Sequence, residues 1–212
     1  MVQRKKGSRD GDIRGVYRRN DLGLRCLLGD DEEAGLMTEI RSDWDKAPIW
    51  FKWALHEIGI REEPENRGPH IREYIKIAHA GSEGDPWCAI FVNAALEASG
   101  VKGTKSASSQ SFRHDENFVT LKGPSLGAIA VFWRGSIASG LGHVGLYRGE
   151  NKTHVYVLGG NEGDMVQIEP LSKHRSSFGL IGYWWPKAIA LPRIGVVPIR
   201  SGQPLGSQEK VT

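Results

Sequence analysis

The sequence predicts an α+β fold, in which N-terminal helices pack on an antiparallel sheet of about five strands. Three observations support this prediction. Apolar residues recur at helical spacing between residues 48 and 100. After residue 123 the apolar segments become short and are bounded by Gly, Pro, Asn or Asp. Helical segments that precede the strands, rather than alternate with them, are typical of α+β proteins.

The first predicted helix starts at Pro48 and ends near Gly59, with apolar residues facing one side. A second runs from Pro69 to about Ala78. A third starts at Asp85-Pro86, an N-cap residue followed by proline, and ends at Gly100. Residues 100–123 are predicted to be mostly loop. Five short segments then predict the strands: Leu126–Trp133, Val144–Arg148, Val155–Leu158, Met165–Ile168 and Leu180–Trp185.

The main domain is expected to cover residues 48–187. Residues 1–47 form an N-terminal extension, because basic residues precede acidic ones there and apolar periodicity is weak. This extension is either a flexible arm or a small element that docks on the main domain or a partner. Residues 188–212 are rich in Pro, Gly and polar residues and are expected to form a C-terminal tail.

The composition excludes several classes of protein. With 212 residues, 39% hydrophobic and 25% charged, the chain is globular and long enough to bury its own core. The net charge of +3 is mild, and no basic stripe with interleaved aromatics indicates nucleic-acid binding. No apolar run follows the basic start, and the longest apolar stretch is far below the roughly 18–20 residues that span a bilayer. We therefore expect a chain made in the cytoplasm without a signal peptide.

Cys88 is the candidate nucleophile. The only other cysteine is Cys26, so a disulfide framework is excluded and a free thiol becomes possible. Cys88 falls in the first turn of the third predicted helix, where unpaired N–H groups and the positive end of the helix dipole favour a thiolate. A buried cysteine without chemistry is the alternative, because such cysteines are common in protein cores.

A reactive cysteine needs a base and a group that orients the base. Of the seven histidines, His143 stands at the start of a predicted strand behind Gly140-Leu141-Gly142, where a substrate backbone has room to approach. Asn161 follows the next strand and would lie near His143 if the two strands are antiparallel neighbours. Glu162 is the competing orienting residue, since a carboxylate would also stabilise an imidazolium.

Three other patterns are weaker. Gly123–Gly127 matches G-x-S-x-G, but a loop precedes it and a strand follows it, which is the wrong context for a nucleophile elbow. The turn at residues 161–164 lacks the spacing of a calcium loop. A zinc site made of Cys88, His143 and His154 has no supporting ligand spacing. We therefore expect neither a metal nor a cofactor.

Four ordered blocks resemble the signature blocks of the CHAP and NlpC/P60 cysteine hydrolases. The blocks are Pro86–Asn93, Val131–Ser136, Gly142–Gly145 and Leu158–Asn161. They are most similar to a bacterial and phage subgroup, which Pro48-Ile49-Trp50 and the closing Gly182–Pro186 also fit. The resemblance covers about residues 47–187 and does not extend to the N-terminal extension or the tail.

This resemblance implies a papain-like fold, with the cysteine at a helix start and the histidine on a following strand. It implies Cys88 as nucleophile, His143 as base and Asn161 as orienting residue. Members of these families typically cleave bacterial cell-wall peptides, as endopeptidases or at the amide joining N-acetylmuramic acid to L-alanine. Residues 48–187 are thus expected to be a catalytic domain that hydrolyses peptidoglycan by acyl transfer.

Further residues are expected to line the cleft. Trp87, Trp133 and the serine loop at residues 106–111, with Ser109, are candidates for substrate contact. For the two tryptophans, packing in the core is the alternative. Arg134 would meet a stem-peptide carboxylate, or else form a surface salt bridge.

Two other function classes stay open. One is a catalytically silent wall-binding or structural module of a phage or secretion particle, and the other is a papain-like peptidase that acts on proteins. The expected partner is bacterial peptidoglycan, without nucleic acid or membrane insertion, and the chain is expected to be a monomer. Further candidate partners are an immunity or inhibitor protein and a phage or secretion carrier. The wall would be reached by lysis, phage delivery or non-classical export.

Overall fold

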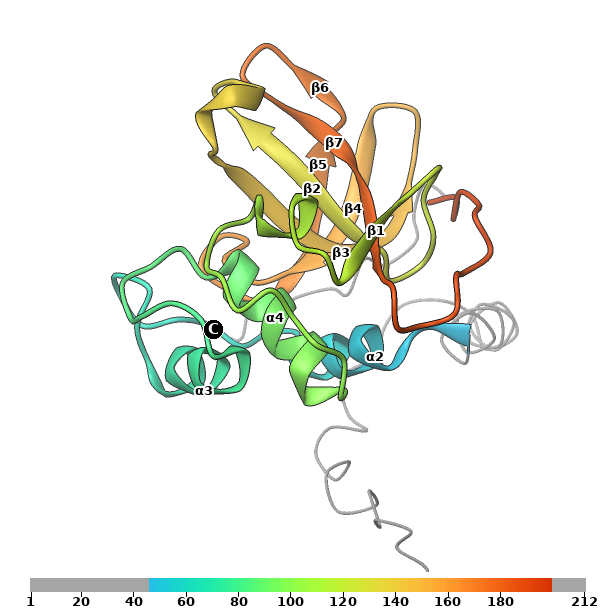
Figure 1. Ribbon diagram of the computed structural model, residues 1–212. Coiled ribbons are helices and arrows are strands. Elements are labelled where there is room, and N and C mark those ends of the chain that lie inside the picture. Colours follow the sequence, from blue (N-terminus) through green and yellow to red (C-terminus); the bar gives the residue numbers. More distant parts are fainter. Residues whose placement is uncertain (1–45, 200–212) are drawn as a thin grey trace, which may run out of the picture. The chain divides into compact units, whose positions relative to one another are not determined.

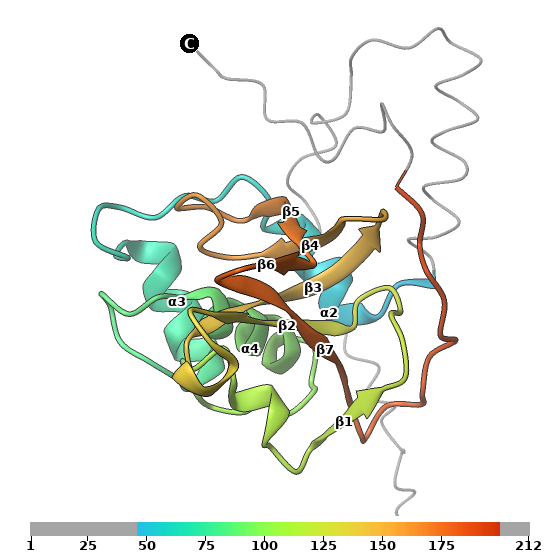
Figure 2. The same ribbon diagram turned by 90° about the horizontal axis from the view of Figure 1, so that it is seen from above.

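The computed structural model describes residues 46–199, and in this range three helices pack on one antiparallel sheet. The α+β class is therefore confirmed. The described residues all belong to one of the chain's two units, which starts at Asp43. The predicted N-terminal extension lies outside the described residues except for its last two positions. Figure 1 shows the helices together on one side of the sheet, and Figure 2 shows the strands from above, with the helices beneath them.

The helices start and end close to the predicted positions. They are α2 (Ile49–His56), α3 (Pro69–Ala78) and α4 (Cys88–Ala98). In α3, Pro69 occupies the first helical position and His79 ends the helix in the left-handed conformation, with φ of 50°. Nearly every residue of α4 is buried, because this helix lies between α2 and α3 on one side and the sheet on the other.

The start of α4 differs from the prediction. The helix begins at Cys88, and its N-cap is Trp87, two residues after the predicted cap Asp85. The Asp85 carboxylate instead accepts the backbone N–H of Ser82 at 2.9 Å and closes a separate turn. Cys88 is consequently the first helical residue, at the place where backbone N–H groups have no partner within the helix.

Seven strands form the sheet, where about five were predicted. They follow the order β1-β7-β2-β3-β4-β5, β6 pairs with β7, and every paired neighbour is antiparallel. The two unpredicted strands are β1, which lies in the segment predicted as loop, and β6, which has two residues. The strands are β1 (Phe118–Leu121), β2 (Ile129–Arg134), β3 (Gly142–Glu150), β4 (His154–Gly159), β5 (Gln167–Ser172), β6 (His174–Arg175) and β7 (Phe178–Pro186).

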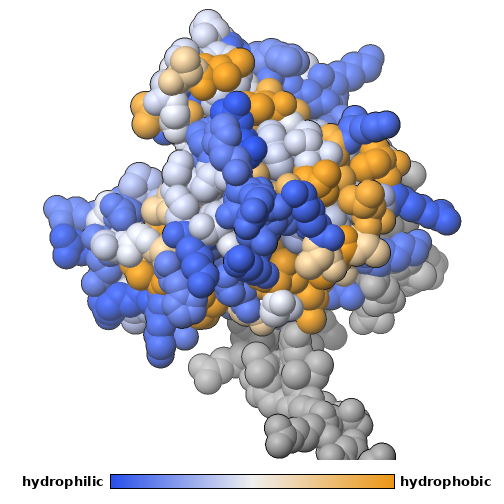
Figure 3. Space-filling view, viewed as in Figure 1, coloured by the Kyte–Doolittle hydropathy of each residue, from blue (hydrophilic) through white to orange (hydrophobic). Residues whose placement is uncertain are grey.

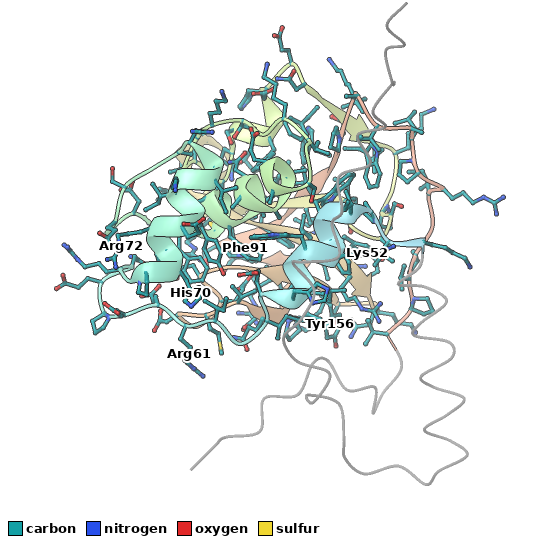
Figure 4. All side chains as sticks on the ribbon, turned by 90° about the horizontal axis from the view of Figure 1, so that it is seen from below. Lys52, Arg61, His70, Arg72, Phe91 and Tyr156 are labelled. Carbon is teal, nitrogen blue, oxygen red and sulfur yellow. The ribbon has the colours of Figure 1, made fainter. Side chains whose placement is uncertain are left out.

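Aromatic side chains fill the space between the three helices. Phe91 of α4 lies among Trp53, Tyr74 and Trp87, with ring centroids 5.4–6.4 Å apart. Viewed from the helix side, Figure 4 shows Phe91 in the interior between the helices. Such edge and tilted contacts add to the free energy gained by burial, so they hold α4 against α2 and α3.

The first part of the predicted tail packs on the domain. We call residues 188–199 the C-terminal strap. Val197 accepts a backbone hydrogen bond from Glu150 at 2.9 Å and donates one to the Tyr147 hydroxyl at 3.2 Å. The strap thus borders the end of β3, while residues 200–212 lie outside the described range. No helix within residues 46–199 is long and apolar enough to cross a membrane.

Candidate active site

Cys88 and His143 meet where the start of α4 abuts the start of β3. His143 is the second residue of β3 and pairs across the sheet with Phe132 of β2. The Cys88 thiol is hydrogen-bonded to the His143 side chain and to the backbone N–H of Val144. Both residues are 6% exposed. Two candidates from distant parts of the sequence are therefore in direct contact.

Glu162 is the partner of the imidazole on its other side. One carboxylate oxygen, Oε1, contacts Nε2 of His143, and the two side chains are 7% and 8% exposed respectively. Neither atom has another hydrogen-bond partner among the described residues. Two hydrogen bonds fix the turn that carries Glu162. The Glu162 N–H donates to the Met165 carbonyl at 3.0 Å, and the Gln167 side-chain amide donates to the Glu162 carbonyl at 2.6 Å. Since Nε2 faces Glu162, Nδ1 is the ring nitrogen left for the thiol.

The three groups shift one another's ionisation. Burial raises the pKa of the Cys88 thiol, but the charge and hydrogen bond of His143 and the Val144 N–H bring it below its ordinary value, against the opposing charge of Glu162. Burial lowers the pKa of His143, but the charges of Glu162 and Cys88 and their hydrogen bonds raise it to about 10. Both shifts favour the thiolate–imidazolium form of the pair.

Asn161, the predicted orienting residue, bonds elsewhere. Its amide donates to the Asn66 side chain at 3.1 Å, and its backbone is left-handed with φ of 59°. This conformation directs the next residue, Glu162, toward His143. The preceding Gly160 allows the turn to approach α4, since a Cβ there would collide with the ring of Trp87. In the structure the imidazole therefore has Glu162 as its partner, the alternative left open by the sequence.

The two candidate tryptophans differ in their surroundings. Trp87 is fully buried, packs against Tyr74 and Phe91, and its indole N–H donates to Glu62. Trp133 pairs with Gly142, whereas Phe132 pairs with His143, so the pleat of β2 puts Trp133 on the opposite face of the sheet from His143. For Trp87 this placement agrees with the packing alternative.

Arg134 and Ser109 are each connected to β2, the strand that pairs with β3 beside His143. Arg134 is exposed at the end of β2, two residues beyond Phe132, and so shares the sheet face of His143. Ser109 is buried beside Gln110, whose side-chain amide donates to the Phe132 carbonyl at 2.8 Å. The serine loop is thus tied to the residue that pairs with His143.

Hydrophobic residues are also exposed beside this site. The connection between β2 and β3 includes Ile137, 60% exposed, and Leu141, 63% exposed, two residues before His143. Figure 3 shows hydrophobic colour at the surface over this connection, and again over the C-terminal strap, where Leu191, Ile194 and Val196 are exposed. Within residues 46–199, no group of three His, Cys, Asp or Glu side chains is placed to hold a metal ion.

Sequence reasoning missed several polar residues that shape the site. Gln110 braces β2, and the fully buried Asn93 of α4 accepts the backbone N–H of Thr104 at 2.7 Å and donates to the Ser106 carbonyl at 3.0 Å, which holds the serine loop. Glu62 accepts the indole N–H of Trp87. A polar residue inside the apolar run of α4 is a signal that could have revealed Asn93. Nothing in the local pattern distinguishes Glu62 from the surface acids around it.

The comparisons with known proteins found no relative. Neither a scan against protein-family models, nor a search of curated proteins, nor a search of solved structures produced a match. The function is therefore argued from the contacts of the site and from the sequence blocks.

Proposed function

We propose that this chain is a cysteine-dependent peptidoglycan hydrolase, which cleaves an amide bond of the cell-wall stem peptide through an acyl-enzyme on Cys88. The observation that supports it most is the buried row of Cys88, His143 and Glu162, in which the thiol contacts an imidazole whose other nitrogen contacts a carboxylate. Nucleophile, base and orienting group in this order are what acyl transfer by cysteine requires.

The proposed reaction has two halves. The Cys88 thiolate attacks the amide carbonyl carbon, the C–N bond breaks, and His143 gives its proton to the leaving amine. His143 then takes a proton from water as the water attacks the thioester, which releases the acid and restores the thiol. Backbone N–H groups at the start of α4 are suited to hold the oxyanion that forms in each half.

The substrate class rests on the sequence blocks. The resemblance to CHAP and NlpC/P60 hydrolases favours cell-wall peptides, and a papain-like fold is part of the same proposal. Three helices on an antiparallel sheet, with Cys88 opening α4 and His143 near the start of β3, are consistent with that fold. Whether the bond is a peptide of the stem or the N-acetylmuramoyl-L-alanine amide is left to experiment.

In this proposal Glu162, rather than Asn161, is the residue that orients His143. A carboxylate on Nε2 stabilises the imidazolium and fixes the tautomer that leaves Nδ1 for the thiol. Asn161 instead donates its side-chain amide to Asn66.

The test is a digest of purified peptidoglycan with the wild type, Cys88→Ala and, as a matched control, Cys26→Ala, with products identified by mass spectrometry. We expect soluble fragments from the wild type and Cys26→Ala and none from Cys88→Ala, and the fragment masses identify the bond. Fragments from Cys88→Ala would refute the proposed nucleophile. Binding of all three proteins to sacculi without release would instead favour a silent wall-binding module, and cleavage of casein alone would favour a peptidase acting on proteins.

A further inference from the structure

Two loops meet beside the active site, and the contacts between them have no role in the reaction as proposed so far. One is the loop at residues 61–66, which follows α2, and the other is the turn at residues 160–165, which contains Glu162. The Glu62 N–H donates to the Asp164 carbonyl at 3.0 Å, and Arg61 forms a β-bridge with Met165. Figure 4 shows Arg61 at the edge of the domain, pointing outward. The neighbouring Glu62 and Asn66 are instead partly buried.

Asn66 lies at the centre of the side-chain contacts between these loops. Its Oδ1 accepts the Asn161 amide at 3.1 Å, and its backbone N–H donates to Glu62 Oε1 at 3.2 Å. The other oxygen of Glu62 accepts the indole N–H of Trp87. Asn161 directly precedes Glu162, and Trp87 directly precedes Cys88. Asn66 is thereby connected to the residue before the nucleophile and to the residue before the carboxylate.

The backbone of both loops is strained. Among the described residues, six non-glycine residues have positive φ, and four of them lie in these loops: Glu65, Asn66, Asn161 and Asp164, with φ of 67°, 56°, 59° and 65°. Side chains other than glycine adopt this region at a cost in free energy, although asparagine tolerates it better than most. Such conformations persist where surrounding contacts hold them, and they gather at functional sites.

We propose that Asn66 is a positioning residue of the hydrolase, whose side chain holds Glu162 against His143 through its contact with Asn161. This inference rests on the proposed function for its effect on turnover, but its effect on the imidazole is independent of any substrate. Without the Asn66 side chain, the turn is free to move Glu162 away from His143, and the imidazolium loses its main stabilising charge.

Three ionisable groups act on His143 from the elements packed around it. They are Cys88 of α4, Glu162 of the turn and, more weakly, Glu169 of β5. Since the Glu162 charge raises the pKa of His143, loss of that contact must lower it. The imidazole is then expected to titrate at least one pH unit below the wild-type protein, in which the pKa of His143 is about 10.

The test compares Asn66→Gly with the wild type. Glycine adopts the left-handed backbone freely, so this change removes the side-chain contacts and leaves the loop conformation allowed. We expect a downward shift of the His143 titration, followed by NMR of the imidazole, and a fall in kcat of about tenfold on peptidoglycan with KM unchanged. Asn66→Asp keeps an oxygen for the Asn161 amide. We expect its His143 titration and its kcat to stay close to those of the wild type.

Two further variants keep the test decisive. His79→Gly changes a left-handed residue outside the two loops and is expected to leave the titration and kcat as in the wild type. Asn161→Gly removes the same contact from the other side and replaces Asn66→Gly if that protein does not fold. An unchanged His143 titration in the tested variant would overturn the inference. If the wild type titrates near pH 10 but cleaves no peptidoglycan, the proposed function fails, and the titration alone decides the role of Asn66.

Discussion

At the scale of single residues, the proposed chemistry depends most on the buried contact between Glu162 and His143. Glu162→Gln removes the charge that stabilises the imidazolium while nearly keeping the side-chain shape. We expect the initial rate of fragment release from peptidoglycan to fall by about 10²- to 10⁴-fold. Glu169→Gln is the matched control, because this half-buried carboxylate bonds Gln167 at 3.2 Å and not the imidazole. Equal losses in the two variants would contradict the role of Glu162.

Gly142 is a second residue whose identity the site requires. A Cβ at this position would overlap the carbonyl oxygen of Phe132 and the side-chain amide of Gln110. We expect Gly142→Ala to push β3 away from β2 next to His143, with a loss of about 1–3 kcal/mol in the free energy of unfolding and a clear loss of activity. Denaturant unfolding measures the first effect.

Gly195→Ala is the control for this change, since a Cβ there meets nothing within 4 Å. Its free energy of unfolding is expected to stay near the wild-type value. If Gly142→Ala were as stable and as active as Gly195→Ala, the close packing of β3 on β2 at the site would not matter.

The same scale shows how far single residues could be predicted. Cys88 and His143 could be found from the sequence, because a helix start favours a thiolate and a glycine-flanked strand start leaves room for a substrate. The partner of His143 could be predicted only to within one residue. Asn161 and Glu162 are neighbours in one turn, and the left-handed backbone of Asn161 decides which side chain points inward. The Asn161 side chain is bonded to Asn66, 95 residues away in the sequence, a contact that the local pattern does not reveal.

At the scale of elements, an ion pair far from the thiol joins three parts of the sheet. Glu150 of β3 contacts Lys173, between β5 and β6, at 2.9 Å and accepts the Tyr183 hydroxyl of β7 at 2.9 Å. The two charged side chains are 12% and 19% exposed. Glu150→Gln leaves the Lys173 charge without its partner, and we expect the free energy of unfolding in urea to fall by about 2–4 kcal/mol.

The matched control is Glu65→Gln, which makes the same chemical change in an exposed pair with Arg67, where the side chains are 81% and 55% exposed. We expect a change within about 0.5 kcal/mol there. A loss in Glu150→Gln no larger than in this control would show that the buried pair does not hold the strands together.

The helices could be predicted better than the strands. Proline at a helix start is a local signal: Pro48 is the N-cap of α2 and Pro69 is the first residue of α3. The sequence predicts a start of α4 two residues too early, because Asp85 caps a turn instead of the helix. β1 was missed because it is four residues long and exists through its pairing with β7, a contact that local pattern does not reveal.

At the scale of the whole molecule, the α+β class follows from the change of apolar period along the chain, and the structure confirms it. The order of strands in the sheet could not be predicted, because β7 lies between β1 and β2 although it comes last in the sequence. The place of the C-terminal strap beside β3 likewise depends on long-range contacts, those of Glu150 with Val197 and Pro198. The proposed reaction type rests on the contacts of the site, while the proposed peptidoglycan substrate rests on the sequence blocks.

The most direct measurement of the central claim, that His143 activates Cys88, is the pH dependence of Cys88 alkylation by iodoacetamide in a Cys26→Ala background. The thiolate reacts, so the midpoint of the rate profile reports the thiol pKa. A lowered pKa means that thiolate is present at pH values where an ordinary thiol is protonated. We predict a midpoint below the ordinary value of about 8.5, and in His143→Ala a midpoint above it, because burial then acts alone. A wild-type midpoint at or above about 8.5, or one that His143→Ala leaves unchanged, would contradict the account.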